Sequence, residues 1–174
     1  LLLALDASDK SCYNGNTQVN DLSGRGMTFN FLNGVPKIEN GAWRIDGNNI
    51  LKGPPSSRLG LNDGDYTIIY RCKINKVTNN VLFLLSGDCG CDNRALGIFP
   101  NWMTTFYYDQ GGCAGDGQRL SIGNVNGTDT MATYALIKNS AGRAIYVNGR
   151  LAAKTGVRGD DLVTNNAPMR FFGF

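Results

Sequence analysis

The sequence predicts an all-β fold, an antiparallel sandwich of two sheets, on three observations. Twenty-three glycines against 5 prolines in 174 residues indicate many tight turns. Asn-Gly and Asp-Gly pairs recur at short intervals, and such pairs suit the positive φ angles of two-residue hairpins. No segment shows sustained helical periodicity, whereas several alternate apolar and polar residues. The length fits one domain over residues 1–174, which we expect to be a piece of a longer polypeptide.

The turn pairs separate short segments of strand character. They are Asn14-Gly15, Asn33-Gly34, Asn40-Gly41, Asp46-Gly47, Asp63-Gly64, Asn126-Gly127 and Asn148-Gly149. Between two of them, the segment 66–74 alternates, so that one side would face a core. The apolar side carries Tyr66, Ile68, Tyr70, Cys72 and Ile74, and the other side carries Thr67, Arg71 and Lys73. This pattern predicts a half-buried strand.

Two hairpins are expected in the second half of the chain. Segments 133–138, 143–147 and 150–154 are joined by a four-residue turn and by Asn148-Gly149, which predicts a three-stranded meander. Residues 94–99 and 102–108 are separated by Pro100-Asn101, which predicts a second hairpin with its turn at that pair. Many short strands without helices favour a sandwich or barrel.

Charge and hydropathy exclude several partners. The net charge is only +3 and the basic residues are dispersed, so a nucleic-acid footprint is not expected. No apolar run approaches the roughly 20 residues that cross a bilayer, so membrane insertion is not expected either. The opening residues 1–5 are apolar but lack the flanks of a signal peptide, which predicts a buried first strand.

The residue types that hydrolases rely on are scarce. The chain has no histidine, and Glu39 is its only glutamate, which removes histidine-based nucleophile arrangements and histidine zinc sites. Two aspartates could still act as acid and base on a polysaccharide. Asp63 and Asp65 would share a strand face, but they lie in a turn-like segment where solvation explains them. We therefore expect a non-enzymatic protein with no catalytic residues.

The order of the segments resembles a known superfamily. The matching runs are Leu5-Asp6-Ala7-Ser8, Asn20 to Gly26, Trp43 to Asn48, Asp65 to Ile68, Ala135 to Lys138, Ala144 to Leu151 and Met169 to Gly173. In this order they are similar to laminin-G-like and concanavalin A-like jelly-roll domains, in which a Tyr-Val-Asn-Gly turn recurs late in the chain. The resemblance covers nearly the whole chain and implies that residues 169–173 form the closing strand.

The resemblance implies more than one function. Domains of this kind include lectins, carbohydrate-recognition and adhesion modules, and modules of virion proteins, and fold alone does not decide among them. The catalytic glutamate motif of the related glucanases is absent here. We expect a non-enzymatic carbohydrate-binding or adhesion module on a secreted protein or a virion. The alternatives are a structural capsid-associated or decoration protein that packs on neighbours in a larger assembly, and, less favoured, a polysaccharide hydrolase.

Some relatives bind calcium through aspartate and asparagine oxygens. Asp46, Asn48 and Asn49 could supply such oxygens here. An Asp- and Asn-rich segment is also what an ordinary turn contains. No cofactor is therefore expected, although calcium is kept as a possibility.

Three of the five cysteines flank the second hairpin. Counting outward from a turn at Pro100-Asn101 brings residues 88–91 opposite 110–113, which predicts a disulfide between Cys89 and Cys113, with Cys91 the alternative partner. Reduced thiols remain a second interpretation. A zinc site completed by Asp88, Asp92 or Asp116 is a third and weaker one. Cys72 is expected to face the core, and Cys12 to lie in a loop with no nameable partner.

Sugar recognition needs an aromatic face for the ring and polar groups for its hydroxyls, and residues 88–119 hold both. The candidate ligand-binding residues are Asp92, Asn93, Trp102, Tyr108, Asp109, Gln110 and Asp116. Tyr107 and Tyr108 would point to opposite sides of a strand, so one of them could be exposed. The alternative is that Trp102 and one tyrosine belong to the core and the loops are merely solvated.

A glycosylation acceptor pattern occurs at Asn126, in the sequence Asn126-Gly127-Thr128. Together with a disulfide it would favour an extracellular or virion-surface location. A glycan or a neighbouring structural protein is the expected partner.

Overall fold

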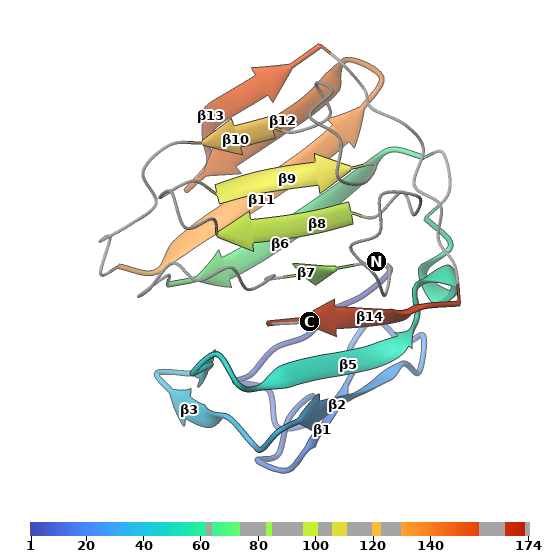
Figure 1. The fold of residues 1–174 in the computed structure, drawn as a ribbon, viewed down its shortest axis with the longest axis vertical. Helices are drawn as coiled ribbons and strands as arrows, with labels where there is room; N and C mark the ends of the chain where they lie inside the picture. Colours follow the sequence, from blue (N-terminus) through green and yellow to red (C-terminus); the bar gives the residue numbers. More distant parts are fainter. Residues whose placement is uncertain are drawn as a thin grey trace.

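The chain is an antiparallel sandwich of two main sheets (Figure 1). The computed structural model describes residues 1–61, 64–73, 83–84, 96–100, 106–110, 120–122, 130–156 and 166–172; for β7, β8 and β9 it describes the backbone and its pairing. The elements are β1 (Gln18–Asn20), β2 (Thr28–Leu32), β3 (Lys37–Glu39), β4 (Ala42–Arg44), β5 (Ile50–Pro55), η1 (Ser56–Leu59), β6 (Tyr66–Cys72), β7 (Phe83–Leu84), β8 (Leu96–Pro100), β9 (Phe106–Gln110), β10 (Leu120–Ile122), β11 (Ala132–Asn139), β12 (Gly142–Val147), β13 (Arg150–Thr155) and β14 (Pro168–Phe171). This confirms the predicted all-β class.

The larger sheet has eight strands in the order β1-β2-β5-β14-β7-β8-β9-β10. Its last strand in sequence, β14, lies in the middle, between β5 and β7, and it pairs with both in antiparallel fashion. The C-terminal strand therefore joins the N-terminal half of the sheet to the half built from the later strands. The strand that the resemblance implied as the closing one is present at this position.

The smaller sheet has the order β13-β12-β11-β6 and contains the predicted meander. In Figure 1 it lies behind β8, β9 and β10, whose strands cross in front of β11 and β12. Burial along β6 and β11 alternates, as expected for strands with one face on a core. Lys138 and Arg143 lie opposite each other at one end of this sheet, and both are buried; Lys138 Nζ is 5.9 Å from the ring centroid of Tyr66.

A shared hydrophobic core fills the space between the layers. Its fully buried members include Phe29, Leu51, Leu136, Ile145 and Met169, which come from both sheets. The N-terminal half of the large sheet is covered by the N-terminal segment and by the β3–β4 hairpin, whose apolar residues pack on the same core. Within this cover, edge-to-face ring pairs join Tyr13, Phe31 and Trp43 at centroid distances of 5.6–5.9 Å.

The first five residues depart from the prediction. They form no strand, and Leu2, Leu3 and Leu5 are half-buried against the core. The backbone of Ala4 is instead held by Asp21, whose Oδ1 accepts from Ala4 N at 2.9 Å, and by Leu22, whose N donates to Ala4 O at 2.9 Å. Asp21, 17 residues along the chain from Ala4, thus provides a hydrogen bond that a neighbouring strand would otherwise supply to this segment.

Three of the predicted turn pairs have positive φ at both residues. Asn33 and Gly34 have φ of 62° and 105°, Asn40 and Gly41 have 52° and 74°, and Asn148 and Gly149 have 49° and 80°. The second and third pairs join β3 to β4 and β12 to β13 as two-residue hairpins, which confirms the predicted chemistry. Asn33-Gly34 instead turns the chain out of the large sheet, because β2 pairs with β5 rather than with β3.

The second hairpin is present, but its predicted turn is wrong. Pro100 pairs with Phe106 and Ile98 with Tyr108, so β8 extends through Pro100 and the connection runs over residues 101–105. Pro100 ends a strand here instead of opening a two-residue turn. In the described part of the chain the only helix is the four-residue 3-10 segment η1, and no helix there is long enough to span a bilayer.

Candidate functional site

Most of the predicted sugar-binding residues lie outside the described part of the chain. These are Asp92, Asn93, Trp102 and Asp116; the glycosylation acceptor Asn126 lies outside it as well. Tyr108, Asp109 and Gln110 fall in β9, where they pair with Ile98, Gly97 and Leu96. The binding role of all seven residues stays a prediction.

The register of β9 separates the two candidate tyrosine positions. Position 108 is paired with Leu120 of β10, which is buried, and position 107 with Ser121, which is exposed. Directly paired residues of antiparallel strands share a face of the sheet. The register thus pairs the two positions with β10 residues of opposite burial.

A depression of about 450 Å³ opens on the outer face of the four-stranded sheet. Its floor is formed by residues that alternate with buried ones: Ile137 of β11, then Ala144 and Tyr146 of β12. Leu151 and Lys154 of the edge strand β13 form its side. The turn between β11 and β12 and the end of β13 close it, with Asn139, Ala141, Thr155 and Gly156 in its lining.

Tyr146 is the aromatic residue of this depression, and its neighbours leave room beside the ring. It pairs with Ala135 on one side and with Leu151 on the other, and the next outward residue on its own strand is Ala144. The tyrosine is half-buried, while Leu151 is 49% exposed. Small partners on two sides and an exposed leucine on the third make a low apolar platform with a phenol at its centre.

The rim of the depression adds polar groups. Lys154 is exposed and pairs with Ala144, one row from Tyr146. Asn139 Oδ1 accepts from Ala141 N at 2.9 Å, which fixes the turn and leaves the amide nitrogen of Asn139 as a donor. An aromatic platform with an ammonium and an amide at its edge can hold a sugar ring and donate to its hydroxyls.

Sequence reasoning missed this site. The Tyr-Val-Asn-Gly run predicts a turn that is typical of a superfamily, and this prediction does not include the face of the sheet on which Tyr146 lies. The signal was available, because Ile145 and Tyr146 are adjacent in a strand and only one of them can face the core. Which of the two is buried depends on the pairing with β11, where Ile145 lies opposite buried Leu136.

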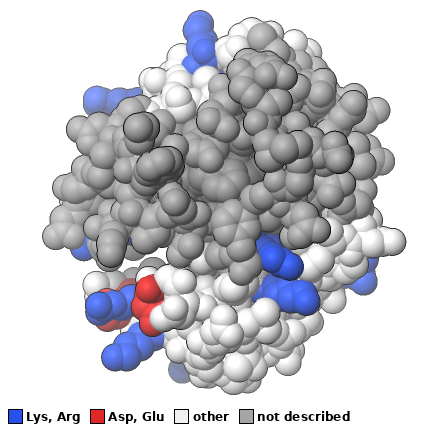
Figure 2. Space-filling view, in the orientation of Figure 1, with Lys and Arg blue, Asp and Glu red and all other residues white. Residues whose placement is uncertain are grey.

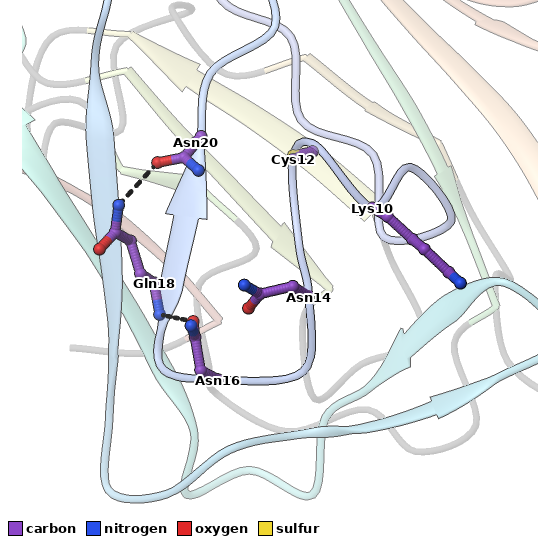
Figure 3. Close-up of a pocket in the computed structure, with 6 residues that line it drawn as sticks. All are labelled: Lys10, Cys12, Asn14, Asn16, Gln18 and Asn20. Carbon is purple, nitrogen blue, oxygen red and sulfur yellow. Dashed lines mark hydrogen bonds between the residues drawn. The ribbon is translucent and has the colours of Figure 1, made fainter.

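A second, smaller pocket of about 100 Å³ lies beside the edge strand β1 (Figure 3). Its wall is built largely of carboxamide side chains, with the residues Lys10, Cys12, Asn14, Asn16, Gln18 and Asn20. Several of these amides are already used: Gln18 Nε2 donates to Asn20 Oδ1 at 2.8 Å, and Asn16 Oδ1 accepts from Gln18 N at 2.8 Å. This pocket is less than a quarter of the volume of the depression at Tyr146, and its amides stabilise the hairpin that contains them.

The possible calcium ligands serve as turn-forming groups. Asp46 Oδ1 accepts from Asn48 N at 2.9 Å, and Asn49, which is buried, donates from Nδ2 to Gly34 O at 3.3 Å. Asp46 thus acts through its oxygen and Asn49 through its amide nitrogen in holding two adjacent turns. Among the described residues, no three histidine, cysteine, aspartate or glutamate side chains are grouped as metal ligands would be.

The described cysteines are unbridged thiols. Cys72 packs against the core as predicted, and burial raises the pKa of its thiol to about 12. Cys12 is also buried, and its Sγ accepts from Asp6 N at 3.3 Å; burial raises the pKa of this thiol as well. Cys89, Cys91 and Cys113 lie outside the described residues. The predicted hairpin register, from which the Cys89–Cys113 pairing was counted, is wrong. The disulfide itself stays a prediction, and the register no longer supports it.

No protein family matches the chain by sequence, and no curated protein matches it. Solved structures with similar folds do exist. Domain 4 of a GH43 extracellular arabinanase from Geobacillus stearothermophilus, in complex with arabinotriose, has a TM-score of 0.63 and 16% identity over 97% of this chain and 82% of that one.

The binding domain of botulinum neurotoxin DC, in complex with SialylT, has a TM-score of 0.67 and 14% identity, and covers 98% of this chain. This chain spans 43% of the length of the toxin chain. At these identities the likeness establishes the fold: a β-sandwich of the kind found in both proteins.

Proposed function

We propose that this chain is a non-enzymatic carbohydrate-binding module that holds a sugar ring in the depression around Tyr146. The observation that carries the proposal is the aromatic platform itself, an accessible phenol set among alanines on the outer face of a sheet. The two similar structures support it, because each was solved with a ligand: arabinotriose on domain 4 of the arabinanase, and SialylT on the binding domain of the toxin.

The platform suits a saccharide by its mixture of surfaces. The apolar face of a sugar ring can lie on an aromatic side chain, while its hydroxyls need donors and acceptors at the edge. Lys154 and Asn139 lie at that edge. The volume of about 450 Å³ falls within the range of small-ligand sites, so the depression would take one or two sugar units of a longer glycan.

The assignment to the laminin-G-like and concanavalin A-like superfamily also belongs to this proposal, as does a setting on a secreted protein or a virion surface. The extracellular origin of the arabinanase domain supports an extracellular setting. Expression through a secretory pathway, followed by enzymatic removal of N-linked glycans, would test it: a mass shift that is lost in Asn126→Gln places the acceptor on a glycosylated surface.

The binding proposal is tested by a glycan-array screen of the folded protein, with and without calcium and with and without reductant, followed by calorimetry on the best ligand. Tyr146→Ala is expected to weaken binding about fivefold or more, because stacking on an aromatic residue contributes on the order of 1 kcal/mol and the platform is lost with it. Tyr146→Phe should retain most of the affinity, since it keeps the ring.

Ile69→Ala is the matched control. Ile69 is 67% exposed and lies on the same outer face, in the same row as Tyr146, but two strands away. Its loss should leave binding unchanged. Glycan binding that survives Tyr146→Ala but is lost in Tyr108→Ala would move the site to the hairpin of β8 and β9. No binding by well-folded protein would overturn the module and favour the structural, assembly-forming role.

A further inference from the structure

A row of polar side chains crosses the outer face of the large sheet, on the opposite side of the sandwich from Tyr146. The register places Gln18 opposite Asn30, Asn30 opposite Lys52, and Lys52 opposite Arg170, in four consecutive strands. Gln18, Asn30 and Lys52 are exposed and Arg170 is half-buried, whereas their strand neighbours Val19, Phe29, Leu51, Met169 and Phe171 are buried. At about 4.8 Å per strand, the row is roughly 14 Å long.

The row contains two cations in direct opposition. Side chains that are directly opposite in antiparallel strands have Cβ atoms about 5 Å apart, and like charges there destabilise the sheet. Within the described part of the chain, the side chains of Lys52 and Arg170 make no hydrogen bond and no ion pair. Figure 2 shows basic side chains side by side over the region where β5 and β14 run in Figure 1, with the red acidic side chains elsewhere on this face of the described molecule.

The pair lies in the interior of the large sheet. β14 is a central strand with β5 and β7 on its two sides, and its register with β5 shifts between Pro168 and Arg170, next to the pair. On β5, the two prolines that follow Gly53 have φ fixed by their rings.

The chemistry of the row indicates its ligand. A guanidinium can donate two parallel hydrogen bonds to an oxyanion, and an adjacent ammonium adds a point charge. The carboxamides of Asn30 and Gln18 extend from this pair in one direction, and carboxamides donate to and accept from hydroxyl groups. Gln18 Nε2 already donates to Asn20 Oδ1, so Gln18 offers its Oε1 as an acceptor. A charged end and a neutral, hydroxyl-compatible end match a sugar that carries an acidic group.

We infer that Lys52 and Arg170 form an oxyanion-binding site, which takes the carboxylate or sulfate of an acidic saccharide while Asn30 and Gln18 contact its hydroxyls. The site is distinct from the depression around Tyr146, because the two lie on the outer faces of different sheets. Its oxyanion chemistry does not depend on the proposed function; the choice of a saccharide as carrier does rest on it.

The test is an NMR titration of the whole chain with sodium sulfate, with glucuronate, with a glucuronate-containing disaccharide and with glucose, at low ionic strength. Sulfate, glucuronate and the disaccharide should shift the signals of Lys52, Arg170 and Asn30, and glucose at the same concentration should not. Arg170→Gln is expected to weaken glucuronate binding about tenfold, which corresponds to the loss of a charge-assisted hydrogen bond. Lys52→Gln should weaken it by a smaller factor.

Arg71→Gln is the matched control. It removes one positive charge from an exposed residue of β6, on the other sheet, and should leave glucuronate binding unchanged. Equal affinity in wild type, Lys52→Gln and Arg170→Gln would overturn the site, as would an equal loss in Arg71→Gln, since that would indicate a net-charge effect. A disaccharide that binds no tighter than sulfate would overturn the saccharide assignment.

Tyr146→Ala distinguishes this inference from the proposed function. Glucuronate and sulfate binding should survive Tyr146→Ala if the cation pair acts independently. A failure of the Tyr146 platform to bind sugars would then leave the shifts at Arg170 intact, whereas a failure of the cation pair would leave sugar binding at Tyr146 intact.

Discussion

Gly53 lies directly against the ring of Phe29. The two residues face each other across β5 and β2, and a Cβ atom on residue 53 would overlap the Cδ1 and Cε1 atoms of the phenylalanine. Phe29 is fully buried and makes an edge-to-face contact with Phe171, at a centroid distance of 5.8 Å. A side chain at position 53 would therefore displace a packed ring, and the glycine is a packing requirement rather than a turn residue.

Gly53→Ala is accordingly expected to destabilise the protein by about 1–3 kcal/mol, because overpacking a filled core forces side chains and backbone to shift. Urea unfolding of wild type and variant measures the difference. Gly64→Ala is the control, since Gly64 has open space around its Cβ position and no positive φ. A Gly53→Ala protein as stable as wild type would mean that Phe29 can move aside.

Asp21 anchors the N-terminal segment in place of a strand. Its Oδ1 accepts from Ala4 N and from Ser23 N, each at 2.9 Å. Asp21→Ala removes the shared acceptor of these two bonds and also Oδ2, which accepts from Ser23 Oγ, and is expected to cost about 1–3 kcal/mol, as for hydrogen bonds to a charged group. Asp21→Asn, which keeps one acceptor oxygen, should cost less.

Hydrogen exchange gives the local readout for this anchor. In Asp21→Ala the amides of Ala4 and Leu22 should exchange faster, because the contact between residues 1–5 and the core loosens. Ser8→Ala, which removes only an exposed side-chain hydrogen bond to Asp6, is the control and should change stability by less than about 0.5 kcal/mol. Unchanged exchange at Ala4 would show that hydrophobic contacts alone hold the segment.

The fold could be predicted because its signals are local. Alternation places Tyr66 and Cys72 on one face of β6, and Asn148-Gly149 specifies its own hairpin. Residues 1–5 could not be predicted, because an apolar run does not reveal whether its backbone is satisfied by a strand or by a side chain such as Asp21. The turn of the second hairpin failed similarly, since Pro100 can end a strand as well as open a turn.

The candidate sites depend on pairings between distant parts of the chain. Lys52 and Arg170 are 118 positions apart in the sequence, and nothing near either of them indicates that β14 inserts beside β5. Tyr146 becomes an outward platform only because Ala135 is its partner. Composition could predict a region rich in aromatic and polar residues, but not which aromatic residue has small neighbours.

The raised pKa of the buried Cys72 thiol predicts that the folded protein loses stability at alkaline pH. Its thiol has a pKa raised by burial to about 12, from an ordinary value near 9. The folded state therefore holds the proton more tightly than the unfolded chain, and this contribution is complete below pH 9. It declines as the pH rises from 9 towards 12, by up to about 1.4 kcal/mol per pH unit.

Comparison of wild type with Cys72→Ala measures this contribution together with its coupling to two tyrosines. The pKa values of Tyr70 and Tyr134 are raised first by burial and further by the charge of the Cys72 thiolate, so this second effect is lost with the thiol. The difference in unfolding free energy should be constant between pH 7 and 8.5 and should shrink above pH 9. A constant difference up to pH 11 would show that Cys72 ionises as readily in the folded protein as in the unfolded chain.

Replacing Lys52 or Arg170 should weaken oxyanion binding and at the same time stabilise the fold. Because two cations face each other without a compensating acid among the described residues, replacing one of them should relieve repulsion. Lys52→Gln is expected to raise the unfolding free energy by about 0.2–1 kcal/mol at low ionic strength. The gain should vanish in 1 M salt, where the Debye length is about 3 Å.

Arg71→Gln is the control and should show no such salt-dependent gain. A Lys52→Gln protein that is less stable than wild type at low salt would mean that the pair is not repulsive. A variant that gains stability while it loses oxyanion binding would identify the pair as a feature kept for its ligand rather than for the fold.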